Sequence, residues 1–171
     1  MMAPQGPLIF PETHEIMDVP CSLCSYPELA SFIRRYGESY PGDAQQLFRR
    51  MVFNILIGNT DDHARNHAFF WNGKHYQLTP AYDICPLLRA GHSAGQAMIV
   101  GNKGRESTMH NALSQAEQFS LTPAEAKNIQ EGITEVIEKR WNDAADIAGL
   151  SNHESKILRQ TTILSPACFY T

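Results

Sequence analysis

The sequence predicts a mainly α-helical domain with one small β-hairpin. Apolar residues recur at helical spacing in two stretches, residues 43–57 and 123–148. Between them, two aromatic-rich runs at residues 67–71 and 75–79 flank Asn72-Gly73, a dipeptide typical of hairpin turns. A chain of 171 residues is long enough for one domain with a sizeable core.

The first 24 residues differ from the rest of the chain. They contain four prolines and no sustained periodicity, which predicts an extended lead-in with at most a short strand at residues 8–10. Ser25 and Glu28 then form the pattern of a capping box, and the helix that they open is expected to end near Gly37. No later linker is polar enough to divide domains, so we assign residues 1–24 to a lead-in and residues 25–171 to a single domain.

The second predicted helix restarts the chain after Pro41. Leu47, Met51 and Ile55, with the two apolar residues at positions 52 and 56, form a stripe wide enough to predict burial on two sides. Gly58 can end this helix in the left-handed conformation.

The second half of the chain is predicted to be a loop followed by helices. Residues 84–108 are glycine-rich around one alternating apolar stretch, residues 97–100, which predicts a loop containing a strand. Residues 101–107 superficially resemble a phosphate-binding loop, but they lack its glycine-lysine-serine ending, so we interpret them as a turn. Helices are expected at residues 109–119, from the Thr122 cap to Gly149, and after the Ser151 cap. The residues expected to hold the long helix against the core are Ile129, Ile133, Val136, Ile137 and Trp141.

The polar run that follows Gly58 is the candidate site. Asp61 and Asn66 have the D-x-x-x-x-N spacing with which protein kinases place a base for the acceptor hydroxyl and an amide ligand for magnesium. The second magnesium ligand should be an aspartate after the next hairpin, where Asp83 stands. Two adjacent aspartates after a helix often only cap a turn, but the hairpin and Asp83 favour the functional interpretation.

Two segments of the chain, I-G-N-T-D-D-H-A-R-N and L-T-P-A-Y-D, resemble the catalytic and metal-binding segments of the HipA-like serine/threonine kinases, the toxins of bacterial toxin-antitoxin modules. The chain is compatible with this family from about Ser25 to Leu164. The resemblance implies a fold similar to a protein-kinase C-terminal lobe, ATP and Mg²⁺ as cofactors, and a protein substrate bearing a Ser/Thr hydroxyl. It also implies that Asp61 is the catalytic base and that Asn66 and Asp83 are the metal ligands.

The same resemblance implies which residues line the nucleotide. Arg65 stands where the family usually has lysine or arginine, and a cation there could approach phosphate. A merely structural His63 remains an alternative to a nucleotide contact. The residues carried over are His63, Ala64, Arg65 and Asn66 from the first segment and Tyr82, Asp83, Ile84 and Cys85 from the second.

Two metal-site alternatives are less well supported by the sequence. His63 and His67 are four residues apart, but a metalloprotease pattern needs a glutamate directly after the first histidine, where Ala64 stands. Cys21 and Cys24, with His14 and Cys85 as further candidates, are weak evidence for zinc without a second such pair. Reduced, unpaired thiols are the favoured interpretation.

The sequence also lacks features of a complete kinase. No lysine precedes Asp61, and the glycines before it form no glycine-rich phosphate loop. We therefore expect a C-terminal lobe only, inactive alone, as a fragment, a truncated product or half of a split kinase. A noncatalytic regulatory binding module is the competing class. Association with a separate N-terminal lobe, an antitoxin or a second copy is expected through residues 8–10 and 86–88.

Composition places further bounds on function. The formal charge of −4 does not favour a nucleic-acid-binding surface. No apolar run is long enough to cross a membrane, and the N-terminus lacks the pattern of a signal peptide. A cytoplasmic location is therefore expected.

Overall fold

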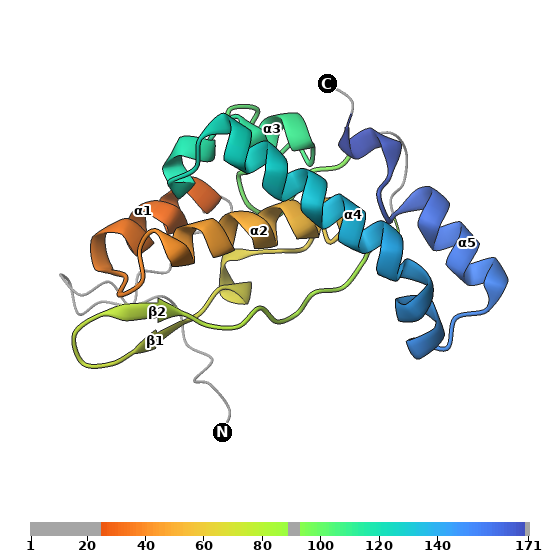
Figure 1. Cartoon of the computed structure of the whole chain (residues 1–171), viewed down its shortest axis with the longest axis horizontal. Coiled ribbons are helices and arrows are strands. Elements are labelled where there is room, and N and C mark those ends of the chain that lie inside the picture. The colour runs from red at the N-terminus through yellow and green to blue at the C-terminus, as the bar shows by residue number, and fades with distance from the viewer. Residues whose placement is uncertain (1–24, 89–92, 170–171) are drawn as a thin grey trace.

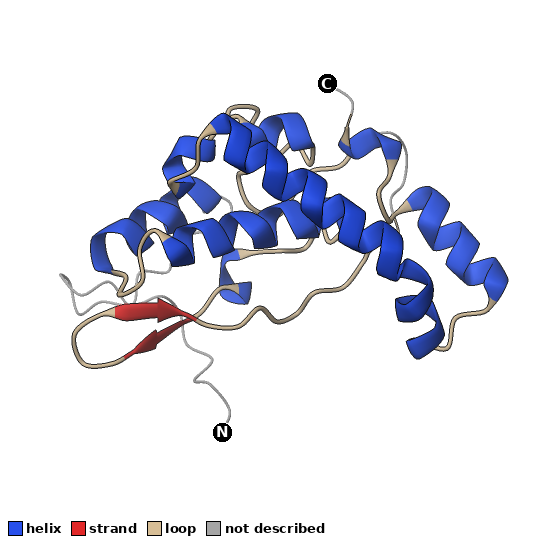
Figure 2. Ribbon diagram, in the orientation of Figure 1, coloured by secondary structure: helices blue, strands red, loops and turns tan. Residues whose placement is uncertain are grey.

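The computed structural model describes residues 25–88 and 93–169 (Figure 1). Within these ranges it confirms the prediction of a mainly helical chain with one two-stranded antiparallel hairpin (Figure 2). The elements are α1 (Tyr26–Tyr36), α2 (Gly42–Ile57), η1 (Ala64–Asn66), β1 (Phe69–Trp71), β2 (Tyr76–Leu78), α3 (Met109–Leu113), η2 (Ala116–Phe119), α4 (Pro123–Ile147), α5 (Asn152–Thr161) and η3 (Pro166–Cys168), where η denotes a short 3₁₀ helix.

Helix α2 lies at the centre of the packing. It contacts α1, α3, α4 and η2, and α4 runs across it in Figure 1. Its wide apolar stripe, including Leu47, Met51 and Ile55, is fully buried, which confirms the predicted burial on two sides. Gly58 ends α2 with a φ of 75°, in the left-handed conformation expected from the sequence.

The hairpin is present but shorter than predicted. Phe69 pairs with Leu78 and Trp71 with Tyr76, so four residues connect the strands. The Asn72 side-chain oxygen accepts hydrogen bonds from the backbone N–H groups of Lys74 (3.0 Å) and His75 (2.8 Å). This side-chain-capped turn extends the connection beyond the two residues Asn72-Gly73 that a tight turn would use.

Three details of the second half differ from the prediction. No strand forms at residues 97–100, where Ile99 makes only an isolated bridge to Ser25. The predicted helix at 109–119 is divided into α3 and η2, because the Ser114 hydroxyl bonds the Asn111 carbonyl (2.6 Å) and ends α3. Val136 is 58% exposed and is not part of the buried core, although Ile129 and Ile137 are buried as expected. The turn expected after Gly101 is confirmed by reciprocal hydrogen bonds between Gly101 and Gly104.

The predicted helix caps are largely confirmed. Thr122 and Ser151 each form a complete capping box at the start of α4 and α5. Ser25 caps α1 only in part, because the Glu28 carboxylate accepts from the Ser25 hydroxyl rather than from its backbone N–H. None of the described helices combines the length and apolar character needed to cross a membrane. The predicted strand at residues 8–10 and the Cys21-Cys24 pair lie outside the described residues.

Candidate functional site

Asp62 anchors the predicted catalytic loop inside the protein. Asp62 is 2% exposed, and one carboxylate oxygen, Oδ2, accepts three hydrogen bonds. The donors are the Tyr26 hydroxyl from α1, the Asn54 amide from α2 at 2.7 Å and His67 Nε2 at 3.1 Å. All three donors are themselves buried. Through Asp62 the loop is therefore held to α1, to α2 and to His67 at the loop's own C-terminal end.

This anchoring distinguishes the two adjacent aspartates. Asp62 is buried and its carboxylate is engaged, whereas the neighbouring Asp61 is exposed. An acceptor hydroxyl from outside the protein can therefore meet only Asp61. The predicted base is thus the accessible member of the pair.

The network also sets the protonation of its members. Burial alone would raise the pKa of Asp62, but the hydrogen bonds from His67, Tyr26 and Asn54 outweigh it and lower that pKa below its ordinary value. Burial, and then the charge of Asp62, raise the pKa of Tyr26 well above its ordinary value, so its hydroxyl stays a donor. The site loop is consequently held by an ionised carboxylate.

This ionised carboxylate predicts acid-sensitive stability. A carboxyl group with a lowered folded-state pKa stabilises the fold above its unfolded pKa of about 3.9, and this contribution is lost as the pH falls from there through the folded pKa. We expect the urea concentration at the unfolding midpoint to decrease as the pH falls below about 4. The decrease should be smaller in Asp62→Asn, which has no carboxylate to protonate at this position. Urea titrations of both proteins between pH 7 and pH 3 check this. An equal decrease of the midpoint with falling pH in both proteins would contradict it.

The rest of the first segment surrounds the short turn η1. Asn66 is buried at its end, Arg65 is exposed, and Ala64 and His63 are partly buried. His63 Nδ1 is buried without a hydrogen-bond partner among the described residues. Such an orphaned nitrogen is consistent with a contact to a bound group as well as with a structural histidine.

Hydrogen bonds bring the second predicted segment against the first. The Tyr82 hydroxyl donates to the Arg65 carbonyl at 2.6 Å, and the Asn59 amide lies 3.5 Å from the Asp83 carbonyl. The Leu87 N–H also bonds the Gly58 carbonyl at 3.1 Å. The residues expected to share one site therefore lie on two segments that are directly bonded to each other.

Asp83 itself has an unusual backbone. Its φ is 55°, in the left-handed region that residues other than glycine adopt uncommonly. Such a conformation costs on the order of 1–3 kcal/mol and is concentrated at functional sites. Asp83, Ile84 and Cys85 are all exposed, so the carboxylate is open to solvent and to ligands.

The donor set fits magnesium better than a transition metal. Asp83 and Asn66 carry hard oxygen atoms of the kind that Mg²⁺ prefers, and Mg²⁺ typically takes one or two protein oxygens and fills its other positions with phosphate and water. Among the described residues, no three His, Cys, Asp or Glu side chains gather as a metal-binding group. His67, required by the hydrolase alternative, is buried and bonded to Asp62.

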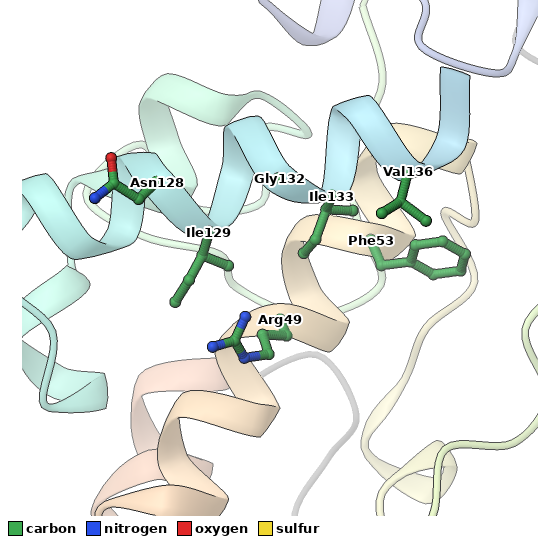
Figure 3. A pocket seen from close by; sticks show the side chains of 7 residues that line it. All are labelled: Arg49, Phe53, Asn128, Ile129, Gly132, Ile133 and Val136. Carbon is green, nitrogen blue, oxygen red and sulfur yellow. The ribbon is translucent and has the colours of Figure 1, made fainter. Parts of the chain in front are cut away.

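A separate hollow lies between α2 and α4 (Figure 3). It encloses ≈ 500 Å³, and Arg49, Phe53 and Val136 are among its lining residues. None of the predicted site residues belongs to its described lining.

Sequence reasoning missed the residues that support the site. Tyr26 lies 36 positions from Asp62 and carries no local signal of this contact. Asn54 could have been noticed, because it is a polar residue within the otherwise apolar stripe of α2.

Comparison with known proteins places these features in a family. The profile of the HipA-like C-terminal domain matches residues 10–141. The chain is 37% identical over 61 residues to a Haemophilus influenzae protein named "Putative kinase", covering 35% of this chain and 18% of that protein. It is 30% identical over 94 residues to Toxin YjjJ of Escherichia coli, covering 52% and 21% of the two chains. It thus spans about a fifth of the length of these curated relatives.

The fold is similar to that in a solved complex of the HipA, HipB toxin-antitoxin system of Shewanella oneidensis MR-1 with its operator DNA. The TM-score is 0.60 at 18% sequence identity, and the match covers 79% of this chain and 32% of the matched chain. This similarity confirms the predicted fold, that of the kinase-like C-terminal part of HipA.

Proposed function

Because the chain belongs to the family of HipA-like C-terminal domains, we propose that it is the catalytic lobe of a serine/threonine protein kinase that uses ATP and Mg²⁺. The observation that carries the proposal is the direct bonding of the two motif segments, through Tyr82 to Arg65 and Asn59 to Asp83. Phosphoryl transfer requires chiefly positioning and charge compensation, and this arrangement favours both.

Each site residue has a role in this proposal. Asp61, exposed beside the anchored Asp62, orients or deprotonates the substrate hydroxyl. Asn66 and Asp83 hold magnesium, which when bound neutralises charge on the phosphate oxygens. The stretches His63–Asn66 and Tyr82–Cys85 line the nucleotide, with the exposed Arg65 able to approach phosphate.

The surface beside the site supports a further lobe or partner. Residues 84–88 are all exposed, and Leu88 is 71% exposed with Ile84 and Leu87 also accessible. A contiguous apolar stretch of this kind is typical of an interaction surface. We propose that it receives the lobe that completes the nucleotide site or an antitoxin-like partner, as the HipA structure is a complex with HipB.

Calorimetric titration of the 171-residue chain with ATP tests the proposal. We expect weak binding that requires Mg²⁺, because the sequence supplies both metal ligands but no lysine or glycine-rich loop before Asp61. Binding should disappear with EDTA and in Asp83→Ala. Asp146→Ala, which removes an exposed carboxylate at the far end of α4, is the matched control and should bind normally.

Two outcomes would contradict this proposal. Tight binding without magnesium, unaffected by Asp83→Ala, would indicate a different nucleotide mode. Absence of any ATP binding by the folded chain would favour the noncatalytic binding module instead.

A further inference from the structure

Helix α2 clamps the exit of the hairpin with two side chains. The Asp43 carboxylate accepts the backbone N–H of Leu78 at 3.0 Å, and Arg50 Nη2 donates to the carbonyl of Thr79. Asp43 and Arg50 are seven residues apart, which places them on one face of the helix two turns apart. The helix therefore fixes two successive residues at the end of β2.

Thr79 is the last buried residue before the exposed segment that carries Asp83. Its N–H bonds the Ala68 carbonyl at 3.0 Å, so Arg50 completes its fixation from the other side. Pro80 follows, and a proline restricts the residue before it to extended conformations. Residues 80–88 are all exposed, so Thr79 is the last buried anchor before the hydrogen bonds at Tyr82, Asp83 and Leu87.

Arg50 is buried, although only one of its three side-chain nitrogens makes a hydrogen bond within the described residues. Its side chain is 7% exposed, and its Nε and Nη1 are buried without a hydrogen-bond partner among the described residues. Burial lowers the pKa of Arg50, while the negative charges of Asp62 and Asp43 act in the opposite direction. Unpaired buried N–H groups oppose folding, so stability alone does not explain an arginine at this position.

We propose that Arg50 is a positioning residue for Asp83, and that it holds the metal-binding segment through the Thr79 carbonyl. This inference rests on the proposed function, since it concerns the same magnesium aspartate. Groups hydrogen-bonded to a metal ligand from outside the coordination sphere typically contribute 10- to 100-fold to metal affinity or activity, and Arg50 acts one step further from the ligand, through the backbone at Thr79.

The test compares Arg50→Met with Arg49→Met in the full 171-residue chain. Arg49 is the adjacent arginine on α2, but it is exposed and lines the α2–α4 hollow (Figure 3). Arg50→Met loses the Thr79 bond and also removes two unpaired N–H groups, so its urea midpoint should stay close to that of the wild type. Its Mg²⁺·ATP affinity should fall by up to roughly 10-fold, whereas Arg49→Met keeps normal affinity and Arg50→Lys recovers most of the loss.

A second measurement does not depend on nucleotide. In the nucleotide-free chain, hydrogen exchange at the Thr79 and Leu87 amides, which flank Asp83 and bond the Ala68 and Gly58 carbonyls, should be faster in Arg50→Met than in the wild type or Arg49→Met. Unchanged exchange in Arg50→Met overturns the positioning role. An affinity loss no larger than the unfolded fraction of Arg50→Met accounts for overturns it as well. If the wild type binds no Mg²⁺·ATP, the proposed function fails, while the exchange comparison still decides whether Arg50 positions Asp83.

Discussion

Replacing Asp62 by alanine is expected to destabilise the folded chain by about 3–5 kcal/mol, the range found when one partner of a buried ionic network is removed. The change leaves three buried donors, from Tyr26, Asn54 and His67, without their shared acceptor. Each buried polar group left unsatisfied costs about 1–3 kcal/mol. Urea unfolding followed by circular dichroism measures the loss directly.

The neighbouring aspartate provides the control for this experiment. Asp61 is exposed, so Asp61→Ala should change stability by no more than about 0.5 kcal/mol. Asp62→Asn, which keeps an acceptor oxygen of similar shape, should fall between the two. Equal effects of Asp61→Ala and Asp62→Ala would show that the network does not anchor the loop.

The second large effect concerns catalysis. The 171-residue chain alone is expected to transfer no measurable phosphate from ATP to protein hydroxyls. Loss of one preorganised charge-stabilising donor typically costs about 100- to 1,000-fold in rate, and here neither the lysine nor the glycine-rich loop precedes Asp61. Transfer should appear when a lobe carrying both is supplied as a separate chain, and Asp61→Ala should abolish it.

Radiolabelled ATP with a generic serine-rich protein acceptor measures this transfer. The Asp146→Ala variant is again the control, because its carboxylate lies on α4 away from the site. Robust transfer by the chain alone, lost in Asp61→Ala, would show that these residues suffice for catalysis without a second lobe. Transfer unaffected by Asp61→Ala would remove Asp61 from the mechanism.

Local signals explain which parts of the fold could be predicted from the sequence. The caps at Thr122 and Ser151 and the left-handed Gly58 depend on residues within one turn, so the helix ends were predictable. The strand expected at residues 97–100 does not form, because an alternating apolar pattern records burial but not whether a partner strand lies alongside. Val136 fits the helical period of α4, yet it faces the open hollow rather than the core.

The candidate site likewise combines local signals, which can be predicted from the sequence, with long-range contacts, which cannot. The spacing of Asp61 and Asn66 and the hairpin before Asp83 identified the two segments, because these signals lie within each segment. The residues that support the two segments could not be predicted from such local signals, because Tyr26 contacts Asp62 across 36 residues and Arg50 contacts Thr79 across 29. Which of two adjacent aspartates is accessible depends on these long-range contacts.

The most direct test of the central claim is nuclear magnetic resonance of the ¹⁵N-labelled chain with ATP and Mn²⁺ in place of Mg²⁺. A paramagnetic ion broadens the amide signals of residues close to it. We expect Asn66 and Asp83 to be broadened together, and Ile129 and Gly132 in the α2–α4 hollow to stay sharp. Broadening that spares Asn66 and Asp83, or that centres on the hollow, would contradict a shared metal site on the two motif segments.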